Sequence, residues 1–158
     1  GFVPRILDIN AERLSIEHSL ERIKQLSPRL ICLVVYGQNP NSGTINMAGA
    51  VKIAKAIKAS QLQVPISVVG SHVSALPVDV LQNEVAFDFV FTNEGVYALR
   101  NLLGVDFRDL SILGTVKGIA YRDCDKVVLS RPETTVPQTR MDVDLPGYAW
   151  DRMCHSGR

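Results

Sequence analysis

Two segments of this 158-residue chain repeat one pattern, a β-branched or aromatic strand that stops at a polar or glycine turn and gives way to a helix. The first is Val68-Val69-Gly70-Ser71-His72-Val73-Ser74-Ala75-Leu76-Pro77, and the second is Phe87-Asp88-Phe89-Val90-Phe91-Thr92-Asn93-Glu94-Gly95. In an open parallel sheet, such turns lie side by side at the carboxyl ends of the strands, where ligands bind. The repeated pattern therefore predicts the place of a site before it identifies a ligand.

The alternation of strands and helices continues along most of the chain. Strands are predicted at residues 3–9, 30–36, 65–69 and 87–91. Helices are predicted between the N-cap Ser15 and Pro28, and at residues 46–59, 78–83 and 95–103. Residues 30–36 are apolar on both faces, which is typical of a central parallel strand covered by helices on either side. The pattern predicts a three-layer α/β domain with right-handed crossovers.

The pattern changes after residue 103. Residues 116–121 and 126–130, separated by a turn at residues 122–125, predict a β-hairpin. Residues 131–158 are interrupted by Pro132, Pro137 and Pro146, which is typical of a linker towards another domain. We therefore expect an α/β domain over residues 1–130 and a linker over residues 131–158.

The amino-acid composition disfavours two classes of partner, nucleic acids and membranes. Lys and Arg total 17 against 16 for Asp and Glu, so the chain has no basic excess of the kind that binds nucleic acid. The apolar runs are far shorter than the ~18 to 20 residues of a membrane helix, and the first residues do not resemble a signal peptide. We expect a cytoplasmic domain without a nucleic-acid or membrane partner.

The three cysteines do not predict a metal site or a disulfide framework. Cys32, Cys124 and Cys154 share no close spacing. Cys32 falls within an apolar strand and is expected to be a small core residue. The pair Cys154-His155 resembles a metal-binding pair only superficially.

Four turns are expected at one edge of the sheet, at residues 8–10, 37–44, 70–74 and 92–95. Glycine in such turns permits close approach of the backbone to a ligand, and the following helix starts favour anionic groups such as phosphate. Neutral side chains at these turns add hydrogen-bonding groups. The turns predict a groove for a large, polar, phosphate-bearing ligand, although glycines also follow strands for purely structural reasons.

Several common ligand and enzyme classes lack their motifs. The sequence contains no GxxxxGK[ST] and no GxGxxG, which disfavours a nucleoside triphosphate or dinucleotide site. It contains no GxSxG, which disfavours a serine hydrolase. The central strand ends in Tyr36-Gly37, where a phosphoacceptor domain would place an aspartate.

Four segments carry a family resemblance. Residues 68–77 resemble GG-x-H-x-T/S-x-x-P, residues 87–95 resemble D-x-V-V-x-G-E-G-E, and residues 113–122 resemble I-x-G-I-x-Y-R. Residues 142–151 resemble D-L-D-x-L-P-x-P-A-W-D. In this order, these motifs resemble the N-terminal cobalamin-binding domains of B12-dependent radical SAM enzymes.

The resemblance implies cobalamin bound at the carboxyl edge of a Rossmann-like (flavodoxin-like) sheet, with its nucleotide tail in the groove. The residues then expected at the cofactor are Asp8, Asn10, Gly37, Gln38, Asn39, Ser42, Thr44, Gly70, Ser71, His72, Ser74, Glu94 and Gly95. The sequence has no CxxxCxxC, so the [4Fe-4S] cluster and S-adenosylmethionine are expected in a downstream radical SAM barrel. This implies a non-catalytic module of a methyltransferase or Fe-S oxidoreductase.

Departures from the family pattern keep two alternatives open. There is no DxHxxG motif, so His72 is expected to form hydrogen bonds rather than to ligate cobalt. Ser71 and Thr92-Asn93 replace family glycines, which favours a scaffold domain that has lost the cofactor. A free-standing α/β transferase would need an acid-base pair drawn from Asp8, His72 and Glu94.

The resemblance also begins at the family's second strand, without the usual first strand and helix. Either the chain is a fragment of a longer protein, or its sheet is built from fewer strands, which would leave a central edge exposed. Such an edge presents unpaired backbone groups to another chain. The sequence therefore predicts pairing at this edge, including pairing in a homodimer.

Overall fold

The computed structural model describes residues 2–37, 40–145, 147–148 and 152. The chain divides into two compact units. One consists of residues 1–27 and 137–158, and the other consists of residues 28–136. The second unit contains the whole sheet and is the larger of the two.

The first unit contains helix α1 (Ile16–Leu26), which begins and ends as predicted. Ser15 Oγ accepts a hydrogen bond from the backbone N–H of His18, and Ser27 adopts a left-handed conformation that ends the helix. Near the other end of the chain, the 3-10 helix η1 (Gln138–Arg140) leads into the short helix α7 (Met141–Asp144). The predicted linker therefore contains local helical structure.

The strand predicted at residues 3–9 was wrong. The segment forms a single bridge, in which the N–H of Ile6 donates to the carbonyl of Arg152 over 3.0 Å. The described part of its own unit provides no neighbouring strand for a ladder. An apolar alternation can form a strand only where such a neighbour satisfies its backbone groups.

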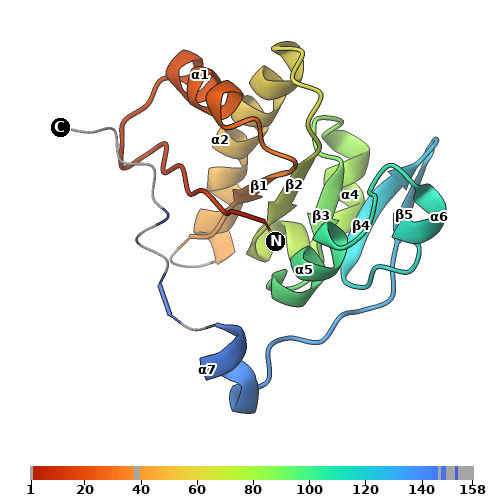
Figure 1. The fold of residues 1–158 in the computed structure, drawn as a ribbon. Coiled ribbons are helices and arrows are strands. Elements are labelled where there is room, and N and C mark those ends of the chain that lie inside the picture. The colour runs from red at the N-terminus through yellow and green to blue at the C-terminus, as the bar shows by residue number, and fades with distance from the viewer. Residues whose placement is uncertain (1, 38–39, 146, 149–151, 153–158) are drawn as a thin grey trace. The chain divides into compact units, whose positions relative to one another are not determined.

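The second unit is built on a five-stranded sheet, shown in Figure 1. Its order is β1-β2-β3-β4-β5, and the strands are β1 (Ile31–Val34), β2 (Ile66–Val69), β3 (Phe89–Phe91), β4 (Ile119–Asp123) and β5 (Lys126–Leu129). The first three strands are parallel, with Val34 opposite Val69 and Val68 opposite Val90. The last two form the predicted hairpin, which joins the sheet antiparallel to β3.

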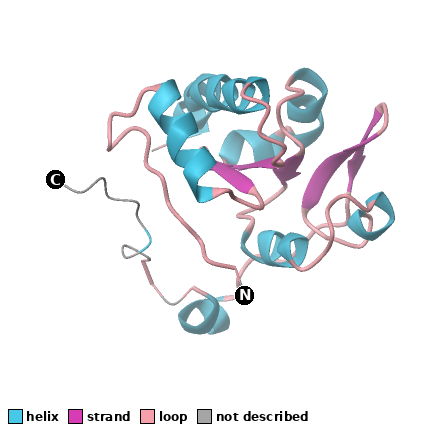
Figure 2. Ribbon diagram, turned by 45° about the horizontal axis from the view of Figure 1, so that its top comes forward, coloured by secondary structure: helices cyan, strands magenta, loops and turns pink. Residues whose placement is uncertain are grey.

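Helices cover both faces of this sheet (Figure 2). Alternate side chains such as Val69, Phe89 and Phe91 pack with residues of α5 (Val96–Leu103) and α6 (Leu110–Leu113) in one buried cluster. On the opposite face, α3 (Ser71–Ala75) and α4 (Pro77–Asn83) contact β3, and Val68 and Val90 are fully buried. The three-layer α/β prediction is confirmed.

Several boundaries differ from the prediction; for example, β1 ends at Val34 and β4 begins at Ile119, where the predicted strands covered residues 30–36 and 116–121. Helix α2 (Pro40–Ala59) begins six residues early, because proline suits the first helical turn and the following small residues allow close packing. The turn predicted at residues 70–74 is instead largely replaced by the short helix α3 (Ser71–Ala75). The hairpin turn consists of Cys124 and Asp125 alone, so the predicted turn residues Arg122 and Asp123 belong to β4.

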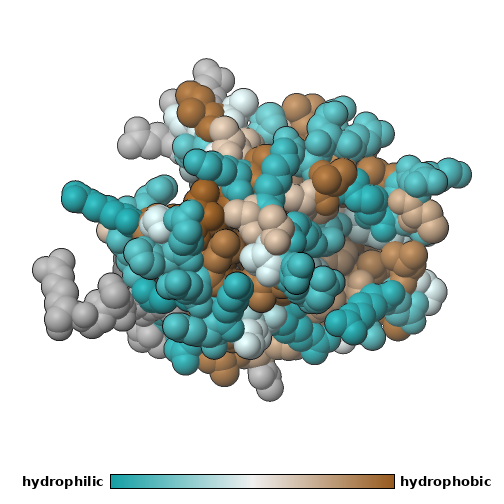
Figure 3. Space-filling view, turned by 90° about the horizontal axis from the view of Figure 1, so that it is seen from above, coloured by the Kyte–Doolittle hydropathy of each residue, from teal (hydrophilic) through white to brown (hydrophobic). Residues whose placement is uncertain are grey.

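The surface combines both kinds of side chain. Figure 3 shows hydrophilic residues interspersed with smaller hydrophobic patches on the face turned to the viewer. Helix α2 carries Lys52, Lys55 and Lys58. Among the residues that the structure describes, no helix combines the length and the apolar character needed to cross a bilayer.

Candidate functional site

The carboxyl ends of β2 and β3 are neighbours at one edge of the sheet, because the two strands pair in parallel. The chain leaves β2 towards α3 on one face and leaves β3 towards α5 on the other face (Figures 1 and 2). Strand ends from which the chain diverges in this way form the crevice where open α/β sheets bind ligands. Ser74 Oγ lies 3.3 Å from the carbonyl oxygen of Phe91 and 3.2 Å from that of Asn93, and it donates across this point.

Close backbone packing shapes the turn after β2. A Cβ atom at Gly70 would lie 2.0 Å from the carbonyl oxygen of Val35 and 2.8 Å from its carbonyl carbon. At separations below 3.0 Å, one of the two groups must move, and here the neighbouring atoms belong to the backbone of Val35. Glycine is therefore required where β1 and β2 end together.

The first turn of α2 packs against the start of α3. A Cβ atom at Gly43 would lie 2.7 Å from Ser71 Oγ, and Thr44 Oγ1 lies 3.1 Å from His72 Nδ1 in a hydrogen bond. Gly37 is equally confined, since a Cβ atom there would lie 2.3 Å from that of Ser42. The segments that follow β1 and β2 are therefore in direct contact through polar side chains.

The turn after β3 is held by its own side chains. Asn93 Oδ1 accepts the N–H of Gly95 over 2.9 Å, and Gly95 has a φ of 80°, which favours glycine. Glu94 Oε1 accepts the N–H of Val136 over 2.5 Å. The third turn is thus ordered by contacts within the sheet unit.

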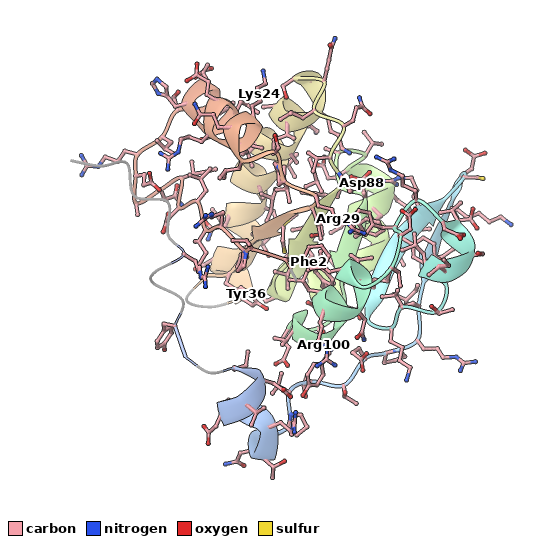
Figure 4. The ribbon with its side chains drawn as sticks, in the orientation of Figure 1. Phe2, Lys24, Arg29, Tyr36, Asp88 and Arg100 are labelled. Atoms are coloured by element: carbon pink, nitrogen blue, oxygen red, sulfur yellow. The ribbon has the colours of Figure 1, made fainter. Side chains whose placement is uncertain are left out.

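Tyr36 adds a titratable group at this edge. Burial raises the pKa of the Tyr36 hydroxyl above 10.0, and the nearby Glu94 carboxylate raises it further. The ring is half exposed, and the tyrosine carbonyl accepts from Asn46 Nδ2 over 3.0 Å. In Figure 4, Tyr36 and Asp88 mark the two opposite ends of the strands. Tyr36 therefore presents a neutral hydroxyl at physiological pH.

The structure brings most of the predicted site residues together. The three turns of the sheet unit gather Gly37, Ser42, Thr44, Gly70, Ser71, His72, Ser74, Glu94 and Gly95. Gln38 and Asn39 lie outside the described residues. Asp8 and Asn10 belong to the other unit, where Asp8 Oδ1 accepts the N–H groups of Asn10 and Ala11 over 3.1 and 2.9 Å.

Sequence reasoning missed three residues at this edge, Tyr36, Asn46 and Asn93. Tyr36 is the last residue of the strand predicted at residues 30–36, and Asn93 lies within the turn predicted at residues 92–95, so position alone offered a signal. Asn46 gave no such signal, because its contact with the Tyr36 carbonyl depends on the early start of α2.

The donor set suits a large polar organic ligand. Hydroxyl, imidazole and amide groups dominate the three turns, and Glu94 is the carboxylate among the predicted residues there. Within the described ranges, no group of three or more His, Cys, Asp and Glu side chains is placed to hold a metal ion. Hydroxyl, imidazole and amide groups form neutral hydrogen bonds with amides and phosphates, so this set is compatible with the large, phosphate-bearing ligand that the turns predict.

Cys32 tests the packing of β1. Burial raises the pKa of its thiol above 9.0, and a hydrogen bond with Ser67 offsets part of this effect. Because the thiolate is the reactive form, iodoacetamide at pH 8 should alkylate the exposed Cys124 at least about tenfold faster than Cys32. Peptide mass spectrometry over time measures both rates. Equal rates would contradict the packing described.

The raised pKa of the Cys32 thiol also predicts how the free energy of unfolding changes with pH. Below pH 9, the Cys32 thiol is protonated in both the folded and the unfolded chain. As pH rises from 9 towards the higher folded-state pKa, the unfolded chain loses this proton first, so the free energy of unfolding decreases. Urea titrations at pH 8 and 10 should show a smaller decrease for Cys32→Ala than for the parent chain.

Comparison with known proteins identifies the family of the domain. The B12 binding domain family model matches residues 1–103. Among solved structures, the radical S-adenosylmethionine methyltransferase TsrM from Kitasatospora setae, with tryptophan substrate and a SAM analogue bound, aligns with a TM-score of 0.63 and 16% identity. The alignment covers 82% of this chain and 24% of that one, and at this identity it shows a shared fold. No curated protein matches. The chain belongs to the B12-binding domain family.

Proposed function

We propose that this chain is the cobalamin-binding module of a B12-dependent radical SAM enzyme, of the methyltransferase or Fe-S oxidoreductase type, and that it is not catalytic alone. Family membership supports cobalamin as the ligand. The order of the four motifs supports the radical SAM assignment, as does the fold likeness to TsrM. The chain spans about a quarter of the length of that protein. We therefore propose the barrel, its [4Fe-4S] cluster and S-adenosylmethionine for the remainder of the parent protein.

The hydrogen bonds that join the turns after β2 and β3 at the carboxyl edge are the observation that carries this proposal. Ser74 joins those turns, and the contact between Thr44 and His72 extends the polar surface to α2. We assign the nucleotide tail to the surface formed by residues 42–44 and 70–74. Cobalamin, when bound, supplies a carrier for a methyl group, and the protein's residues hold and orient it.

Retention of hydroxocobalamin tests the proposal. The purified chain, mixed with excess hydroxocobalamin and desalted, should keep the visible absorption of the corrinoid. Ser74→Ala removes the hydroxyl that joins the two turns and should weaken retention several-fold. Ser60→Ala is the matched control, because its hydroxyl donates to the carbonyl of Ile57 near the end of α2. It should bind like the parent chain.

Absence of retained corrinoid at high micromolar ligand would overturn the proposal and favour the scaffold alternative. One observation supports that alternative. The side chains of Asn93 and Glu94 already form hydrogen bonds with the backbone of Glu133 and Val136, and such bonds would serve a scaffold without a cofactor. A scaffold domain would keep the fold and bind the barrel without cofactor. Equal retention by the parent chain and Ser74→Ala would instead remove the crevice as the place of binding.

The sheet edge formed by β1 is a candidate site for pairing with another protein chain. β1 ends the sheet in the described unit, and the Val34 side chain is 68% exposed. Unpaired backbone groups at such an edge can pair with another strand. We propose this edge as the place where a second copy of the chain pairs to form a homodimer.

A further inference from the structure

Residues 131–136, here named the strap, run from the end of β5 back to the turn after β3. Asn93 Nδ2 donates to the carbonyl of Glu133 over 3.0 Å, and Glu94 Oε1 accepts the N–H of Val136 over 2.5 Å. Val136 is the last residue of the unit that contains the sheet. Two adjacent side chains of one turn therefore hold the point where the chain leaves this unit.

Two further contacts fix the strap. Asn101 Nδ2, on α5, donates to Glu133 Oε2 over 2.8 Å, and the N–H of Gly118 donates to the carbonyl of Arg131 over 2.8 Å. Gly118 has a φ of +76°, and a Cβ atom there would lie 2.7 Å from Glu133 Cβ. Glycine at position 118, just before β4, therefore leaves the space that the strap occupies. A larger side chain there would fill that space.

The contacts reach the strap from three separate elements, namely the turn after β3, helix α5 and the segment before β4. A carboxylate that accepts a backbone N–H forms a charge-assisted hydrogen bond, which is stronger than a neutral one. The bonds from Val136 to Glu94 and from Asn101 to Glu133 are therefore the stronger restraints on the strap, and the first of them acts at the exit of the chain. The bond to Glu94 lies at the carboxyl edge of the sheet, in the turn after β3.

We propose that Asn93 and Glu94 are positioning residues that anchor the outgoing chain at the carboxyl edge. The polypeptide after Val136 then starts from a fixed point next to the cofactor surface. A tether that begins there raises the effective concentration of the following segment at that edge, compared with a free linker. This role goes beyond cobalamin binding, and it operates whether or not the cofactor is present.

Amide hydrogen exchange of the 158-residue chain without cobalamin tests the anchor. Glu94→Ala should speed exchange of the Val136 amide at least about tenfold, because the amide loses its acceptor. Glu94→Gln keeps an oxygen acceptor and should give an intermediate rate. Asn93→Ala should speed exchange across residues 133–136 as well, because it releases the Glu133 carbonyl. Exchange in β2 should stay unchanged in all three.

Asp109→Ala is the matched control, since Asp109 Oδ1 accepts the N–H of Ser111 over 3.0 Å elsewhere in the same unit. It should speed exchange at Ser111 and leave Val136 unchanged. The proposal is overturned by an unchanged Val136 rate in Glu94→Ala. It is also overturned if all amides accelerate together, because that result reports global destabilisation. Failure of cobalamin retention leaves this test intact, so the two proposals fail separately.

Discussion

Gly70→Ala should lower the free energy of unfolding by about 2–4 kcal/mol and abolish retention of hydroxocobalamin. The added methyl would lie 2.0 Å from the carbonyl oxygen of Val35, closer than any ordinary contact. Neither atom can rotate away, because the N–H of Val35 also donates to the carbonyl of Val69 over 2.8 Å. The ends of β1 and β2 must therefore separate, and the turn after β2 must move with them.

Gly49→Ala is the matched control for this experiment. Gly49 lies within α2, and a Cβ atom there would meet nothing within 4 Å apart from its chain neighbours and the adjacent backbone of its own helix. Alanine in a helix interior is more favourable than glycine by up to about 1 kcal/mol, so this variant should equal or exceed the parent in stability. Urea titration measures both variants. If Gly70→Ala is as stable as the parent, the close approach of the two strands is incorrect.

Arg122→Ala should lower the free energy of unfolding by about 2–4 kcal/mol. The guanidinium of Arg122 donates to the backbone carbonyls of Leu81, Glu84 and Phe87, the last over 3.0 Å. These carbonyls belong to the end of α4 and the segment that leads into β3. Removal of the guanidinium leaves three partly buried acceptors without this donor, so the connection from α4 to β3 should loosen.

Two other arginine substitutions sharpen the Arg122 test. Arg122→Lys keeps the charge, but an ammonium lacks the planar fork that reaches several carbonyls, so it should recover only part of the loss. Arg108→Ala removes an exposed arginine from the same unit and should change stability by less than about 0.5 kcal/mol. Urea titrations that give equal stability for the Ala variants at positions 108 and 122 would contradict the role of Arg122.

Local pattern predicted the parallel strands because their residues are apolar and β-branched and are bounded by turns. The same pattern failed at residues 3–9, since a strand also depends on a neighbour that the local sequence does not supply. The early start of α2 was missed because residues 40–45 contain glycine, serine and asparagine, which are typical of loops. Packing against Ser71 compensates for that weak helix propensity.

The candidate site was predicted to a similar extent. A strand followed by a polar turn indicates the carboxyl edge, so Gly70, Ser71 and Ser74 could be chosen from the sequence. The hydrogen bond from Ser74 to the Asn93 carbonyl and the anchoring of Val136 by Glu94 could not. Both join residues far apart in the chain, and their pairing follows from the arrangement of the strands.

The central claim is that cobalamin binds at the carboxyl edge of the sheet. Amide hydrogen exchange with and without hydroxocobalamin tests it most directly. We expect slower exchange at residues 42–44 and 70–74 in the presence of the corrinoid. No change is expected near Asp88, at the opposite end of β3, whose carboxylate pairs with Lys58 over 2.7 Å. Protection centred on residues 84–88, or an unchanged exchange pattern at saturating hydroxocobalamin, would contradict the assignment.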